Sequence, residues 1–261
     1  MIPLYRVVTG TGTPPIVFVH GFACAHADWA AQVAHFSPRH RCVALDLRGH
    51  GESPGEPADC SIERYGADVA DVLRALSLPP AVLVGHSMGC RVVVEAALQA
   101  PALVSGLVLV DGSQFAPAMQ PVLRERFAAP GGFDAVATAL FVDMFTARSD
   151  PAVRDAVVAR ARRMNPETGA KLLLDLLRYD VHRLEASLRS LRVPMLALQA
   201  TFSNEKRERA TMAKGQTSPY LEMLRTCVPG VRIEIVENTG HFPQLDEPAA
   251  TNAAIERFLA A

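Results

Sequence analysis

The segment that constrains the architecture most reads AVLVGHSMGC, residues 81–90. Its first half is a short aliphatic run typical of a buried strand, and its second half opens an Ala- and Val-rich stretch, residues 88–100, that is typical of a helix. Between the two lies a Gly-x-Ser-x-Gly pattern, whose glycines at positions 85 and 89 let the strand and the helix approach closely. Ser87 is therefore expected in a strained turn at the amino end of the helix, with its hydroxyl projecting outward.

Short apolar runs elsewhere in the chain predict further strands, over residues 16–20, 42–47, 106–111, 195–199 and 231–236. Most are apolar at nearly every position, which is expected when helices cover both faces of a parallel sheet, whereas the last run alternates and suits a strand near the sheet's edge. Helical patterns lie between the strands, over residues 29–36, 62–76, 219–227 and 249–259, with Ser61 as the N-cap of the second. This alternation predicts an α/β fold with a mostly parallel, doubly wound sheet that binds ligands at the carboxyl ends of its strands.

One interval interrupts the alternation of strands and helices. Residues 113–191 contain no strand-like run, and helices are expected to begin near Pro121, Phe133, Pro151, Pro166 and Val181. The pattern predicts a helical cap, residues 113–192, inserted into a core formed by residues 1–112 and 193–261. Most apolar cap positions are expected to pack inside the cap while a few face the site; they are Leu140, Phe141, Met144, Phe145, Leu173, Leu176 and Leu177.

Composition limits the functions that the chain can have. Its 261 residues are 49% hydrophobic and 20% charged, as in an ordinary globular protein. With 26 basic and 27 acidic residues the net charge is -1, so no positive surplus favours nucleic acid as a partner. No apolar run reaches the roughly 18 residues of a membrane span, and the first residues lack a signal peptide's features, so we expect a cytoplasmic protein that does not bind a membrane. The 5 cysteines are scattered, which predicts reduced, buried thiols and neither disulfides nor a metal site.

Chemistry at Ser87 requires further groups. A serine hydroxyl is a weak nucleophile until a base takes its proton and an acid holds that base in the right tautomer. His241 is the best base, because it follows the last predicted strand and the turn at residues 238–240 and so falls at the same sheet edge as Ser87. Negative charge on a carbonyl oxygen needs preorganised donors, which we predict to be the backbone N–H groups of Met88 and of Phe22, the latter in a sharp loop after the strand at residues 16–20.

Four motifs together resemble those of one known family. They are His20-Gly21-Phe22, the segment DLRGHGES at residues 46–53, the Gly-x-Ser-x-Gly at residues 85–89, and Gly240-His241-Phe242. With them the chain resembles, over its whole length, the α/β-hydrolase superfamily with a helical cap. The resemblance implies a structural role for residues 46–53, and a serine at position 87 argues against the epoxide hydrolases and haloalkane dehalogenases of this fold, which need an aspartate nucleophile.

The chain departs from the family pattern at the acid. Most relatives carry an aspartate after the strand equivalent to residues 195–199, but here the loop at residues 200–209 contains none. Asp111 ends the preceding strand at the same sheet edge, and some family members carry their acid there, so Asp111 is the preferred candidate. Glu205 is the second candidate because it lies near the usual position, and Glu208 is weaker because residues 206–209 read as an exposed charged loop.

The resemblance implies hydrolysis of carboxylic esters of small, largely apolar molecules through a Ser-His-Asp triad and an acyl-enzyme. No nucleotide-binding glycine motif or metal cluster is present in the sequence, so no cofactor is expected. A lactonase, a thioesterase or a carbon–carbon bond hydrolase would use the same triad. A hydroxynitrile lyase, a perhydrolase or a slow ligand-sensing hydrolase relative are the alternatives from other classes, and the sequence leaves open whether the chain forms a homodimer.

Overall fold

A seven-stranded sheet forms the centre of this computed structural model, which describes residues 2–203 and 208–261. The strands run in the order β1-β3-β2-β4-β5-β6-β9. They are β1 (Arg6–Thr9), β2 (Ile16–Val19), β3 (Cys42–Leu45), β4 (Ala81–His86), β5 (Val104–Val110), β6 (Met195–Gln199) and β9 (Arg232–Ile235). β1 pairs antiparallel with β3, and the other pairs are parallel. The mostly parallel sheet and each of the predicted strands are confirmed, and β9 lies at the sheet's edge as expected.

Strand β1 has no counterpart among the predicted strands. It is only four residues long, and its Val7 and Val8 are 37% and 39% exposed because the strand forms the other edge of the sheet. A short, half-exposed edge strand carries neither the continuous apolar run of a buried strand nor a clear alternation.

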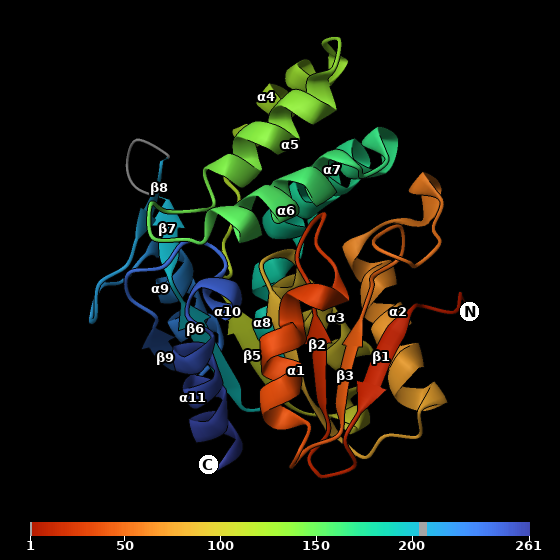
Figure 1. Cartoon of the computed structure of the whole chain (residues 1–261), viewed down its shortest axis with the longest axis vertical. Coiled ribbons are helices and arrows are strands. Elements are labelled where there is room, and N and C mark those ends of the chain that lie inside the picture. The colour runs from red at the N-terminus through yellow and green to blue at the C-terminus, as the bar shows by residue number, and fades with distance from the viewer. Residues whose placement is uncertain (1, 204–207) are drawn as a thin grey trace.

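Helices cover both faces of the sheet (Figure 1). On one face lie α1 (Ala30–Phe36) and α11 (Pro248–Leu259), and on the other lie α2 (Ile62–Ala75), α3 (Met88–Gln99), α8 (Leu184–Ser190) and α9 (Pro219–Cys227). Ile16 and Phe18 of β2 enter the first of these two cores, whereas Val17 and Val19 enter the second. Burial on both faces explains why the strands are apolar at nearly every position. Short elements complete the core: the 3₁₀ turns His26–Trp29, Pro57–Asp59 and Pro101–Leu103, and α10 (Pro243–Asp246).

Five helices were expected between β5 and β6, and the described chain has them, counting α8 named above. They are α4 (Met119–Ala128), α5 (Gly132–Val142), α6 (Pro151–Arg162), α7 (Pro166–His182) and α8. α6 and α7 begin at the predicted prolines, but Val181 lies in the last turn of α7, and α8 begins three residues later. In Figure 1, α4 to α7 lie above the carboxyl ends of the strands, while α8 lies beside the core.

A two-stranded ribbon follows β6, formed by β7 (Thr201–Ser203) and β8 (Arg209–Thr211). The two strands pair antiparallel, with Ser203 directly opposite Arg209. This pairing corrects the expectation of an exposed charged loop at Arg209 alone, whose side chain is only 19% exposed; Glu208 is exposed, and residues 206 and 207 lie outside the described residues. The 5 cysteines are buried, as predicted. None of the described helices is both long and apolar enough to span a bilayer.

Candidate active site

The turn between β4 and α3 holds Ser87 in a strained conformation. Its φ is 53° and its ψ is -113°, a region that residues with a Cβ rarely adopt. The neighbouring glycines permit this turn: a Cβ on Gly85 would lie 2.3 Å from the carbonyl oxygen of Gly89, and one on Gly89 would lie 2.5 Å from that of Val19. The backbone N–H of Ser87 donates to Val110 of the adjacent strand at 3.0 Å, which fixes the turn against β5.

His241 lies beside this serine. Its Nε2 is 2.8 Å from Ser87 Oγ, and its Nδ1 is 2.6 Å from Oδ2 of Asp111. A carboxylate only accepts hydrogen bonds, so Nδ1 carries the proton and Nε2 is left to accept one from the serine hydroxyl. Burial, followed by the positive charge of Arg209, lowers the pKa of His241, so the imidazole is neutral and available as a base near pH 7.

Asp111 is fully buried at the end of β5, with a φ of 44°. Its Oδ1 accepts the backbone N–H groups of Ala200 and Thr201 at 2.7 and 2.8 Å, and its Oδ2 accepts the Thr201 hydroxyl at 2.6 Å. Burial by itself would raise the pKa of this carboxyl, but the hydrogen bond from His241 and the positive charge nearby hold the pKa below its ordinary value. The structure thus brings the preferred acid to the base. The alternative acid, Glu205, lies outside the described residues.

The loop that carries Phe22 contacts the serine turn closely. A Cβ on Gly21 would lie 3.1 Å from the Cβ of Ser87. His20 holds the loop: its Nε2 accepts the N–H of Leu47 at 2.9 Å, so its Nδ1 carries the proton and donates to the carbonyl oxygen of Gly21 at 2.7 Å. In a trans peptide the N–H points away from the carbonyl, so the N–H of Phe22 faces away from His20.

Met88 is the first residue of α3, where a backbone N–H has no partner within the helix. Both Phe22 and Met88 line the cavity in front of Ser87. These positions fit the predicted pair of donors for a developing oxyanion, with the helix dipole adding to the donor at Met88.

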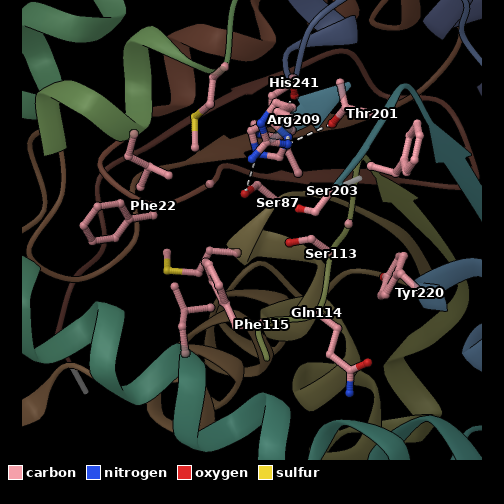
Figure 2. A pocket seen from close by; sticks show the side chains of 18 of the residues that line it. Phe22, Ser87, Ser113, Gln114, Phe115, Thr201, Ser203, Arg209, Tyr220 and His241 are labelled. Atoms are coloured by element: carbon pink, nitrogen blue, oxygen red, sulfur yellow. Dashed lines mark hydrogen bonds between the residues drawn. The ribbon is translucent and has the colours of Figure 1, made fainter. Parts of the chain in front are cut away.

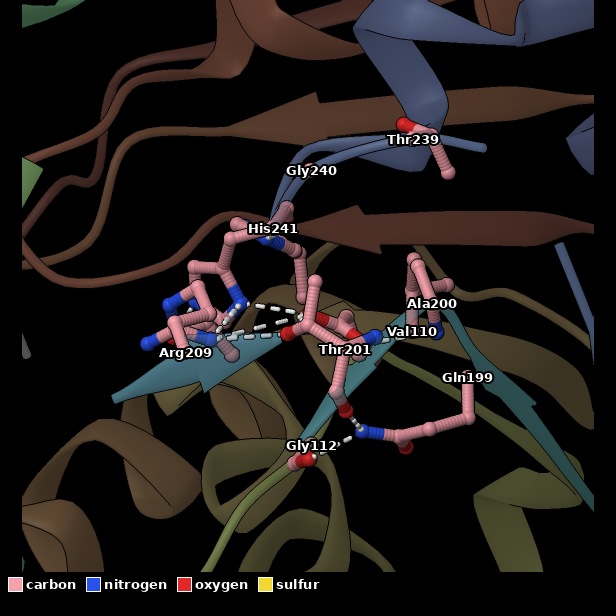
Figure 3. Close-up of polar contacts among 12 residues, drawn as sticks. Val110, Gly112, Gln199, Ala200, Thr201, Arg209, Thr239, Gly240 and His241 are labelled. Carbon is pink, nitrogen blue, oxygen red and sulfur yellow. Dashed lines mark hydrogen bonds and ion pairs between the residues drawn. The ribbon is translucent and has the colours of Figure 1, made fainter. Parts of the chain in front are cut away.

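Two residues at the site were not predicted to take part in it, Arg209 and His86. Nη1 of Arg209 lies 3.1 Å from Nδ1 of His241 and donates to the Thr201 hydroxyl at 2.8 Å, and Figure 3 shows these three residues together. Nε2 of His86 donates to the backbone carbonyl of His241 at 2.7 Å, which fixes the loop that carries the base. Burial, and then the nearness of His241, lower the pKa of His86 to about 3, so it stays neutral. No sequence pattern indicated Arg209, whereas the position of His86 beside Ser87 was a usable signal.

A cavity of about 170 Å³ opens in front of Ser87. Its cap wall is apolar and includes five of the seven cap positions considered above, more than the few that were predicted: Leu140, Phe141, Met144, Leu173 and Leu176. The opposite wall is more polar; in Figure 2, Ser203, Ser113 and Tyr220 lie across Ser87 from Phe22. Among residues 2–203 and 208–261, no group of three or more His, Cys, Asp or Glu side chains is placed to hold a metal ion.

A mostly parallel doubly wound sheet, with a serine in a glycine-flanked turn at the carboxyl end of a central strand, defines the class of α/β hydrolases. The model of the alpha/beta hydrolase family matches residues 16–254, and the chain belongs to this family.

The chain is also similar to individual proteins. An uncharacterised protein of Mycobacterium tuberculosis is 28% identical over 279 residues, which is 97% of this chain and 76% of that protein. The sn-1-specific diacylglycerol lipase of Mus musculus is 40% identical over 114 residues, which is 42% of this chain and 37% of that protein. The solved structure of an N-acyl homoserine lactone degrading enzyme has a TM-score of 0.83 at 24% identity, covering 98% of this chain and 97% of its own, and so shares the fold.

Proposed function

We propose that this chain is a serine hydrolase that cleaves carboxylic ester bonds of small molecules through an acyl-enzyme. The observation that carries the proposal is the line of hydrogen bonds from Ser87 through His241 to Asp111, at 2.8 and 2.6 Å. A nucleophile, a base and an orienting acid in this order are what activation of a serine hydroxyl requires. Family membership supports hydrolysis as the class of reaction.

In the first half of the reaction, Oγ of Ser87 attacks the ester carbonyl carbon while Nε2 of His241 takes its proton. Asp111 stabilises the imidazolium that forms. The carbonyl oxygen becomes an oxyanion, which the backbone N–H groups of Phe22 and Met88 would receive. When the tetrahedral intermediate collapses, the bond to the alcohol oxygen breaks and His241 returns the proton to that oxygen.

In the second half, water replaces the alcohol beside His241. The imidazole takes a proton from the water as its oxygen attacks the acyl carbon, and then gives that proton to Ser87 Oγ when the acyl-enzyme bond breaks. The products are an alcohol and a carboxylic acid, and the enzyme returns to its starting protonation. His241 accepts or donates the proton in each transfer of this cycle.

The walls of the cavity indicate the size of the substrate. A space of about 170 Å³ suits a short acyl chain, and the apolar side chains of α5 and α7 would bury it. Within the predicted cap of residues 113–192, we therefore propose that α4 to α7 shape the substrate site on the core of residues 1–112 and 193–261, whereas α8 packs with that core.

A fluorophosphonate probe followed by mass mapping tests the nucleophile. We expect labelling of Ser87 in the wild type, none in Ser87→Ala, and unchanged labelling in Ser105→Ala, whose hydroxyl is exposed and bonds Pro80 far from the cavity. A panel of p-nitrophenyl esters, lactones and thioesters would then rank the substrates. Labelling at another residue, or full ester turnover by Ser87→Ala, would overturn the proposal.

A further inference from the structure

Two arginines line the cavity, and they differ in how their donors are used. The Arg91 guanidinium donates to both carboxylate oxygens of Asp180, at 2.8 and 2.7 Å, and to the backbone carbonyl of Ser87 at 3.1 Å. The Arg209 guanidinium donates from Nη1 to the Thr201 hydroxyl, but its buried Nε has no hydrogen-bond partner among the described residues. Arg91 is therefore committed to the fold, whereas the described residues leave part of the hydrogen-bonding capacity of Arg209 unused.

Among the described residues, the two carboxylates near Arg209 lie beyond hydrogen-bond distance of it. Oδ2 of Asp111 is 3.9 Å from Nη1 and already accepts hydrogen bonds from Thr201 and His241. Oδ2 of Asp143 is 4.0 Å from Nε, beyond hydrogen-bond distance, and its side chain is 59% exposed and so remains solvated. A guanidinium with a free edge recognises carboxylate or phosphate through two parallel hydrogen bonds.

Arg209 also lies where it affects the reacting groups. Only the imidazole ring of His241 separates its Nη1 from Oγ of Ser87, since Nη1 is 3.1 Å from Nδ1 and Oγ is 2.8 Å from Nε2. Because Nδ1 of His241 carries a proton, it cannot accept a hydrogen bond from Arg209. The contact therefore places the positive guanidinium next to the ring that becomes a positive imidazolium during the reaction. An anion bound to Arg209 would offset that repulsion.

A second polar group accompanies the guanidinium. Ser203 pairs directly with Arg209 across the β7–β8 ribbon, so the two side chains lie on the same face. Both line the cavity in front of Ser87, where Figure 2 labels them. A guanidinium and a hydroxyl that are paired across the ribbon, on the polar wall of the cavity, form a site for a compact anion.

We propose that Arg209 and Ser203 bind a carboxylate of the substrate, so that the preferred substrates are esters of short dicarboxylic acids with one carboxylate free. This inference rests on the ester hydrolysis proposed above and names the esters that the site takes. The apolar cap wall contacts the carbon chain, and the carboxylate lies at the polar end.

The test compares two esters of similar shape that differ in charge. They are the p-nitrophenyl half-ester of glutaric acid and p-nitrophenyl 5-methylhexanoate, whose isopropyl end replaces the carboxylate. We expect a higher kcat/KM for the charged ester in the wild type, and a loss of this preference by about 10- to 100-fold in Arg209→Met, as for hydrogen bonds to a charged group. Arg154→Met, which removes an arginine from an exposed helix surface, is the matched control and keeps the preference.

A binding measurement separates this inference from the proposed function. Calorimetry with glutarate alone is expected to show binding to the wild type and to Arg154→Met but not to Arg209→Met. If the wild type hydrolyses neither ester, the proposed ester hydrolysis is refuted. The glutarate measurement alone then shows whether Arg209 and Ser203 bind a carboxylate. A preference or a glutarate affinity that survives in Arg209→Met overturns the subsite. If circular dichroism shows that Arg209→Met is unfolded, Arg209→Gln and Ser203→Ala replace it, and a preference unchanged in both overturns the proposal.

Discussion

Replacing Asp111 by Asn is expected to hold His241 in the wrong tautomer. Oδ1 of Asp111 accepts two backbone N–H groups, those of Ala200 and Thr201, so only the carbonyl oxygen of an asparagine can take that position. The amide NH₂ then replaces Oδ2, which is 2.6 Å from Nδ1 of His241. Two donors cannot face each other, so Nδ1 gives up its proton to Nε2, and Nε2 can no longer accept the proton of Ser87.

The magnitude follows from the loss of the base. Loss of the orienting carboxylate in a serine triad costs on the order of 10⁴ in turnover, which is about 5.4 kcal/mol at about 1.36 kcal/mol for each factor of ten. The assay is kcat for p-nitrophenyl butyrate with Asp111→Asn, Glu205→Gln and, as a control, Asp155→Asn, whose carboxylate is exposed. Near-normal turnover in Asp111→Asn together with a collapse in Glu205→Gln would refute the assignment.

Three other outcomes follow from the structure. Gly89→Ala is expected to lower Tm and activity because its Cβ would lie 2.5 Å from the carbonyl oxygen of Val19; a wild-type melting curve would contradict this. The pH profile of kcat/KM is expected to fall on acidification with a midpoint below 6.5, because burial lowers the pKa of His241, which must be neutral to take a proton; a midpoint above 6.5 would count against the base. Asp180→Ala is expected to cost about 3–5 kcal/mol of unfolding free energy in urea, because it leaves Arg91 buried and unpaired; a loss under about 0.5 kcal/mol would show that the pair contributes little.

The parts of the site that could be predicted are those that strand ends position. Ser87, Asp111 and His241 each follow a strand of one parallel sheet, and the carboxyl ends of such strands meet at one edge. Apolar runs long enough to be recognised therefore located all three side chains. Their backbone strain, such as the φ of 44° at Asp111, had no signal in the sequence, because it arises from the contacts that surround the folded residue.

Arg209 could not be predicted, for a physical reason. The strands of its ribbon are three residues each, too short for any periodicity to appear, and the charges around it are typical of a solvated loop. Its burial comes from the pairing of β8 with β7, which places the side chain over the Asp111 carboxylate. A local sequence pattern cannot predict where the Arg209 side chain lies, because that position depends on the pairing of two strands of three residues each.

One contact couples the cap to the base. The backbone N–H of His241 donates to the carbonyl oxygen of Met144 at 2.7 Å, and a Cβ on Gly240 would lie 2.4 Å from that same oxygen. Met144 follows α5, and its side chain lines the cavity, while the preceding Asp143 lies near Arg209. A shift of this turn would therefore change the pocket wall and the position of the imidazole together. Because of this coupling, cap changes that keep the backbone of the turn should alter which substrates bind, whereas changes that move the turn should also lower kcat for every substrate.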